Sequence, residues 1–218
     1  NHINCQFWQR LYSSLIMAIA INGSGTVTGI SVGGLPDGIV DTDMLANNAV
    51  TSAKATGRGI TEADNWVLTT TYTASSGVDT TDPIASNLAR SSFTGASYLG
   101  TGMTESSGIF TFPSTGFWLV TAQFTINVQA SRAEEHAQVF IKFTSDGTNY
   151  VDASSGYTFG EDYSSSRYSN IAISSLLDIT NVSTHKIKFK TIMSNTTRVI
   201  GSTSPEHTAF KFIRLGDT

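Results

Sequence analysis

The sequence predicts an all-β chain whose main domain is an antiparallel sandwich of the jelly-roll type. Several short runs alternate apolar and polar residues, Gly-, Ser- and Asp-containing turns separate them, and no helix-length pattern with a 3.6-residue period interrupts them. About eight to ten strands joined by turns are typical of a sandwich or jelly roll. The chain has 218 residues, which is enough for one large domain or two small ones.

The clearest strand follows a turn at Pro113 and Gly116. From Trp118 to Val128 every second residue is apolar, and from Thr121 onward the residues between them are polar. Successive side chains of a strand point to opposite faces, so one face packs against a core and the other is more exposed to solvent. A slip of one residue would invert every side chain, and the pattern therefore specifies the register of this strand.

Other runs complete the predicted sandwich. They cover residues 66–73, 93–99, 109–112, 137–143, 150–159, 171–179, 186–190 and 207–215. Asp146-Gly147 predicts a hairpin turn between two of them. In the last run, residues 207–215, apolar residues occupy both odd and even positions, which predicts a strand buried on both faces.

The residues before the sandwich predict an extended segment. Residues 18–34 hold five glycines among Ile, Val and Thr, and Asp41 or Thr42 can cap a short helix over residues 43–53. Residues 55–64 show no periodicity. We therefore expect an attachment or shaft segment over residues 17–64, a boundary near 61–65, and the jelly-roll domain over 65–218.

The first residues have two interpretations. Met17 is the expected start, which makes residues 1–16 upstream or non-native sequence. Alternatively, Arg10 and the apolar residues after it form a secretory signal. No apolar run reaches the ~20 residues of a membrane-spanning helix, so no membrane insertion is expected.

Composition argues against several functions. Only 14% of residues are charged, the net charge is -4, and no Lys/Arg cluster occurs, so nucleic-acid binding is not expected. The single cysteine, Cys5, and the four histidines lack zinc-type spacing. Serine is abundant, but a nucleophilic serine needs a base placed beside it and the sequence offers none, so we expect neither an enzyme nor a cofactor.

Acidic and aromatic residues in predicted loops are the remaining candidates for binding. Oxygen-rich loops can bind Ca²⁺, but EF-hand spacing is absent and solvated acids are the favoured interpretation. These acids are Asp79, Asp82, Asp152, Glu161 and Asp162. Tyrosines among Ser and Gly are typical of adaptable recognition loops, and the alternative is a polar hairpin with edge tyrosines. The tyrosines are Tyr150, Tyr157, Tyr163 and Tyr168.

Phe110, Gly116, Trp118 and Val120 carry a family resemblance. A Phe, five residues, a Gly and then alternating aromatics resemble a signature of the complement and tumour necrosis factor jelly-roll superfamily. Val120 stands where that family has a second aromatic residue. Residues 208–215 are similar to the family's closing strand, without its usual small residue between the aromatics.

The resemblance implies a homotrimer with aromatic residues along its threefold axis, and some members of the superfamily bind Ca²⁺. A strand that is apolar on both faces also needs a cover, which closed rotational symmetry supplies. The predicted interface residues are Phe110, Phe112, Phe210 and Phe212. The alternative is that these rings fill the sandwich of one subunit.

Residues 17–50 resemble the opening of marine tailed-phage fibre or appendage proteins, which pair a slender attachment segment with a jelly-roll tip. This resemblance implies a virion protein whose N-terminal segment binds other virion proteins and whose tip binds a host-surface glycan or protein. The alternatives are a capsid-decorating protein, a secreted bacterial jelly-roll protein and a glycan-degrading tailspike.

Overall fold

The computed structural model describes residues 50, 59–73, 84–128, 137–158, 165–193 and 197–218. The chain divides into two units, Asn1–Lys54 and Ala55–Thr218, and the strands that the structure describes belong to the second. The helix expected over residues 43–53 lies outside the described residues, apart from Val50. None of the described residues is helical, and therefore none belongs to a helix that could cross a membrane.

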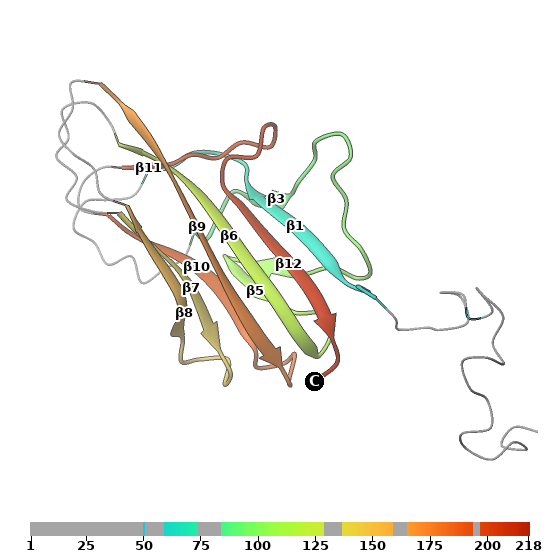
Figure 1. The fold of residues 1–218 in the computed structure, drawn as a ribbon. Coiled ribbons are helices and arrows are strands. Elements are labelled where there is room, and N and C mark those ends of the chain that lie inside the picture. Colours follow the sequence, from blue (N-terminus) through green and yellow to red (C-terminus); the bar gives the residue numbers. More distant parts are fainter. Residues whose placement is uncertain (1–49, 51–58, 74–83, 129–136, 159–164, 194–196) are drawn as a thin grey trace, which may run out of the picture. The chain divides into compact units, whose positions relative to one another are not determined.

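The larger of two antiparallel sheets is centred on β6 (Gly116–Val128), which pairs along its whole length with β9 (Arg167–Ile179). The other edge of β6 pairs with β12 (Ala209–Gly216) and then with the short β11 (Arg198–Val199). Figure 1 shows β9, β6, β12 and β1 side by side. The remaining strands of this sheet are β1 (Ala63–Leu68) beside β12, β3 (Leu88–Arg90) beside β1, and β2 (Tyr72–Thr73) beside β11.

The smaller sheet packs against the larger one and has the strand order β4-β5-β10-β7-β8. Its strands are β4 (Thr104–Ser106), β5 (Ile109–Thr111), β10 (Lys186–Met193), β7 (Ala137–Thr144) and β8 (Val151–Thr158). The all-β antiparallel jelly-roll prediction is confirmed. β1 begins inside the segment 61–65 where the sequence analysis placed the boundary.

The alternation predicted for β6 is confirmed. Its inward side chains are at most 8% exposed: Trp118, Val120, Ala122, Phe124, Ile126 and Val128. Burial of each large apolar side chain stabilises the fold by roughly 1.5–3 kcal/mol. Gly116, at the start of β6, has a φ of 134°, and a Cβ there would collide with the Gly216 carbonyl oxygen of β12.

Rings from both sheets form the centre of the core. Phe110 of β5 lies with its ring centroid 5.2 Å from that of Phe212 in β12 and 5.3 Å from that of Trp66 in β1. The ring of Phe189 in β10 contacts those of Phe110 and of Phe210 in β12. The two layers are therefore joined by aromatic contacts rather than by aliphatic packing alone.

Residues 93–99 correct one prediction, because they form a loop instead of a strand. Ala96 N donates to Phe93 O across 2.9 Å, and Gly95 has a φ of 96°. Phe93, Tyr98 and Leu99 are 41–50% exposed, so the apolar residues of this run do not define a buried face. The short strands β3, β4 and β11 were not predicted, because two or three residues are too few to show a period.

The Asp146 turn between β7 and β8 is confirmed as a hairpin turn. Asp146 Oδ1 accepts hydrogen bonds from the backbone nitrogens of Asn149 at 2.7 Å and Thr148 at 2.8 Å. These bonds, followed by those from the side chains of Asn149 and Thr144, lower the pKa of the Asp146 carboxyl well below its usual range.

Candidate functional site

The structure corrects the interface predicted from the phenylalanines. Phe110, Phe112, Phe210 and Phe212 are all at most 1% exposed within a single chain. Their rings contact one another and Trp118, so they fill the sandwich, as the alternative interpretation held. A side chain that is buried within its own subunit has no surface with which to contact another subunit. Contact between subunits therefore requires a different surface of the molecule.

The predicted recognition tyrosines do not gather at one place. Tyr157 of β8 is 59% exposed on the outer face of the smaller sheet, and Tyr168 of β9 is 70% exposed on the outer face of the larger sheet. These two faces lie on opposite sides of the core. The centroid of the Tyr150 ring lies 4.1 Å from Lys188 Nζ, and burial raises the pKa of the Tyr150 hydroxyl. Tyr163 lies outside the described residues.

The acids considered for Ca²⁺ are not assembled into a site where the structure describes them. Asp152 lies in β8 rather than in a loop, and its carboxylate is 2.7 Å from Lys142 Nζ. Asp79, Asp82, Glu161 and Asp162 lie outside the described residues. Among the residues that are described, no group of three His, Cys, Asp or Glu side chains could hold a metal ion.

Apolar side chains cross the outer face of the larger sheet in one row. Leu176 of β9 opposes Leu119 of β6, Leu119 opposes Ile213 of β12, and Ile213 opposes Ala63 of β1. Leu176 is 61% exposed and the other three are half-buried. Strands lie about 4.8 Å apart, so the four side chains form a continuous band.

One more apolar side chain extends this band toward the end of the sheet. Phe117 of β6 is 39% exposed. We call the five side chains the apolar patch: Ala63, Phe117, Leu119, Leu176 and Ile213. A contiguous exposed apolar surface on a single chain marks a place where another surface binds.

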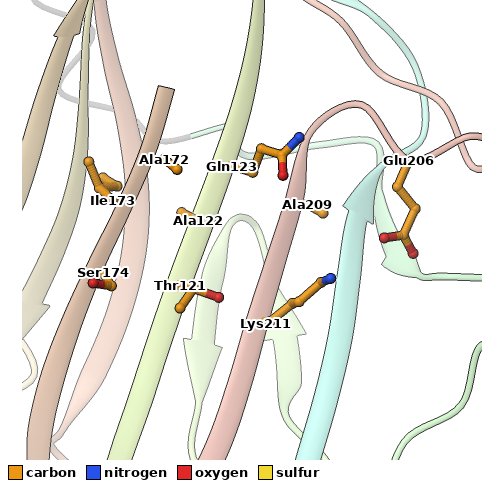
Figure 2. Close-up of a pocket in the computed structure, with 9 residues that line it drawn as sticks. All are labelled: Thr121, Ala122, Gln123, Ala172, Ile173, Ser174, Glu206, Ala209 and Lys211. Carbon is orange, nitrogen blue, oxygen red and sulfur yellow. The ribbon is translucent and has the colours of Figure 1, made fainter. Parts of the chain in front are cut away.

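A hollow of about 340 Å³ lies beside the apolar patch on the same face. Figure 2 shows mostly small side chains from β9, β6 and β12 around it, with Lys211 and Glu206 on the side away from β9. We call it the central hollow, and its lining is Thr121, Ala122, Gln123, Ala172, Ile173, Ser174, Glu206, Ala209 and Lys211. The short side chains leave a depression that a protruding side chain of another molecule can fill.

Lys211 carries a positive charge on this face. Within the described part of the chain its ammonium makes no ion pair, whereas Glu206 Oε1 accepts a 2.7 Å hydrogen bond from Asn65 Nδ2. The face therefore combines an apolar half with a polar half that still has hydrogen-bonding capacity.

The sequence contained a signal for this face. The apolar residues on the second parity of the closing strand predicted burial on both sides, but Leu215 is half-exposed and Ile213 is only half-buried in the single chain. Phe117 and Leu119 lie on the same face of β6 as the polar residues Thr121 and Gln123. Only the pairing of β6 with β9 and β12 shows that Leu119 lies beside Leu176 and Ile213.

Comparison with solved structures places the fold among proteins of the tumour necrosis factor type. The Eiger TNF of S. frugiperda is similar over 74% of this chain and 96% of its own, with 14% identity and a TM-score of 0.55. Murine APRIL is similar over 71% of this chain and 98% of its own, with 12% identity and a TM-score of 0.49. No protein-family model and no curated protein sequence matches this chain.

Proposed function

We propose that this chain assembles as a homotrimer through the outer face of the larger sheet and serves as the binding tip of a virion appendage. The observation that carries the proposal is the apolar patch, whose most exposed member, Leu176, is 61% open to solvent in the single chain. Covering such residues is favourable by about 25 cal/mol for each Å² removed from water.

The size of the face fits contact with another subunit. The lengths of β9, β6, β12 and β1 at strand rise and spacing give roughly 650 Å² of sheet. A standard protein interface buries about 800 Å² on each partner, so this face accounts for most of one. Because all copies carry the same patch, closed rotational symmetry covers it in every subunit.

Three subunits are favoured by the family resemblance, since trimers are the form implied by the complement and tumour necrosis factor superfamily. The fold likeness to Eiger TNF supports the same jelly-roll framework for the subunit. Three tips on one appendage bind a repetitive surface multivalently, so weak single contacts give strong attachment.

The assignment to a virion rests on residues 17–50, which resemble the opening of phage fibre proteins. In this arrangement the N-terminal unit binds other virion proteins, and the sandwich faces the host surface outside the cell. Its role is to bind a glycan or protein there without catalysing a reaction.

The test is the mass of the purified full chain by light scattering after gel filtration at micromolar concentration. The wild type is expected at three times the 23.3 kDa chain mass. Leu176→Asp, at the β9 end of the apolar patch, is expected to give monomers, because a buried unpaired carboxylate opposes assembly.

Val151→Asp is the matched control. Val151 is 63% exposed, nearly the same as Leu176, but it lies on β8 of the smaller sheet. This variant is expected to remain trimeric. A wild-type chain that is strictly monomeric, or two aspartate variants that behave alike, would refute assembly through the apolar patch.

A further inference from the structure

The apolar row on the outer face of the larger sheet does not end at β1. Leu99, in the loop that follows β3, forms an isolated antiparallel bridge with Ala63. Ala63 N donates to Leu99 O across 3.1 Å, and Leu99 N donates to Ala63 O across 2.8 Å. Residues directly opposite each other in an antiparallel pair project to the same face, so the Leu99 side chain continues the row beyond Ala63.

The extended row has two exposed ends and a half-buried middle. Leu176 is 61% exposed at the β9 end, and Leu99 is 47% exposed at the loop end. The half-buried side chains between them are Leu119, Ile213 and Ala63. Four steps of about 4.8 Å between neighbouring strands separate the two ends by roughly 19 Å. None of the five side chains is charged, which is typical of the core of a protein interface.

Leu99 is held in a defined position by the residues around it. Besides the bridge to Ala63, the carboxylate of Glu62 accepts a 2.8 Å hydrogen bond from Thr101 N, two residues after Leu99. The ring of the preceding residue, Tyr98, has its centroid 4.4 Å from the guanidinium carbon of Arg90. A side chain that is already ordered loses little conformational entropy when a partner covers it.

The loop adds area that the strands alone do not supply. The four strands β9, β6, β12 and β1 give roughly 650 Å² of sheet, whereas a standard interface buries about 800 Å² on each partner. Leu99 lies one step beyond β1 on the same face, so a contact that includes it is wider than the four strands. A second copy of this chain carries an uncharged row of equal length, and it is the occupant that matches this surface.

We propose that the two ends of the extended row meet between subunits, so that Leu176 of one subunit packs against Leu99 of the next. A threefold rotation about an axis along the strands turns the three outer faces toward that axis, and neighbouring faces then meet along opposite edges. The β9 edge of one subunit adjoins the loop edge of the next. Such a contact joins two different patches and forms a ring when the rotation closes.

This inference deepens the assembly proposed above and rests on it, because the partner is a second copy of the chain. It assigns the loop after β3 to the subunit contact and pairs two named side chains within that contact. A twofold arrangement with its axis along the row would instead place Leu176 against its own copy. The two arrangements therefore differ in which side chains meet.

The first experiment is the mass of full-length Leu99→Asp by light scattering after gel filtration at micromolar concentration. The mass is expected to fall from three chain masses to one, because the contact would bury an unpaired carboxylate. Ile109→Asp is the matched control, since Ile109 is 36% exposed on β5 of the smaller sheet, and it is expected to remain trimeric. Circular dichroism of both variants is expected to match the wild type, because both side chains are at the surface.

The outcomes separate this inference from the proposal on which it rests. A trimeric Leu99→Asp beside a monomeric Leu176→Asp would overturn the contact at Leu99 and leave assembly through the apolar patch intact. A monomeric wild type would refute the assembly itself, and the contact at Leu99 with it.

The second experiment is cross-linking between cysteines in a Cys5→Ser background, which lacks the one native cysteine. Oxidation of the double variant Leu99→Cys/Leu176→Cys is expected to give a band at three chain masses on a non-reducing denaturing gel. Each single variant is expected to stay at one chain mass. A short bismaleimide is the second reagent, because a disulfide forms only when the two Cα atoms lie within about 7 Å.

Val151→Cys/Leu176→Cys is the matched control pair, because Val151 is 63% exposed on β8 of the smaller sheet. It is expected to give no trimer band with either reagent. A Leu99→Cys/Leu176→Cys trimer that neither reagent links, or covalent dimers of Leu176→Cys alone, would overturn the inference.

Discussion

The rings of Phe189 and Phe210 stack across the interior with centroids 4.0 Å apart and planes 20° from parallel. Phe189 belongs to β10 of the smaller sheet and Phe210 to β12 of the larger one. Phe210 also meets the ring of Phe124 edge-on, with centroids 5.6 Å apart. Phe210 therefore contacts both the opposite layer, through Phe189, and the neighbouring strand β6 of its own layer, through Phe124.

Replacement of Phe210 by Ala is expected to lower the free energy of unfolding by about 3–5 kcal/mol, because it removes a fully buried ring and leaves a cavity. The measurement is chemical denaturation at one fixed protein concentration. Tyr157→Ala, at a 59% exposed position, is expected to change the free energy of unfolding by about 0.5 kcal/mol or less. A similar loss in both variants would contradict the central role of the stacked pair.

Asp64 is expected to be a main determinant of the conformation of the loop after β3. Its buried carboxylate accepts from Trp66 Nε1 at 2.9 Å and from Met103 N at 2.7 Å, besides pairing with Arg90. Asp64→Asn leaves at least one buried donor without a suitable acceptor, at a cost of about 1–3 kcal/mol in unfolding free energy.

Asp178→Asn is the matched control for this carboxylate, because Asp178 lies on the exposed face of β9. Its expected effect is within about 0.5 kcal/mol. Hydrogen exchange at the Met103 amide provides a local measurement, and it is expected to accelerate in Asp64→Asn alone. Unchanged protection at this amide would show that the loop is held by other contacts.

Gly156 of β8 lies where the two sheets approach each other closely. A Cβ there would lie 2.6 Å from Ile171 Cγ2 and 2.8 Å from Ile173 Cγ2, both in β9. Gly156→Ala is therefore expected to destabilise the fold by about 1–3 kcal/mol through overpacking. Gly216→Ala makes the same change where no atom lies within 4 Å, and thermal unfolding is expected to show no loss there.

The hairpin carboxylate gives a pH dependence with a defined sign. The folded pKa of Asp146 is held below the unfolded value of about 3.9 by its hydrogen bonds, the largest from Asn149 N. The carboxylate therefore stabilises the folded state above pH 3.9, and this contribution is lost as the pH falls through the folded pKa.

Denaturation of wild type and Asp146→Asn at a series of pH values tests this dependence. The wild type is expected to be the more stable near neutral pH, and the difference is expected to shrink as the pH falls below about 3.9. A difference that stays constant from neutral pH to the acid limit of folding would mean that the turn does not depend on the charge of Asp146.

Strand positions and inward faces could be predicted wherever alternation continued for several residues, as it does from Trp118 to Val128. The Asp146-Gly147 turn could be predicted because its chemistry is local. By contrast, the exposed loop at residues 93–99 resembled a strand by composition alone. The predicted tyrosine cluster failed for another reason: Tyr157 and Tyr168 lie in strands of different sheets, so closeness in sequence did not bring them together.

The amino-acid sequence by itself determined the class of the fold, the register of β6 and the inward direction of Trp118 and Phe124, because alternation with a period of two is a property of neighbouring residues. Tertiary structure alone decided which outward residues adjoin. Leu176 and Ile213 become neighbours of Leu119 only through strand pairing, and Asn65 meets Glu206, 141 residues further along the chain, only in the folded state. Surfaces and hollows combine residues distant in the chain, and their chemistry is defined only once the strands have paired.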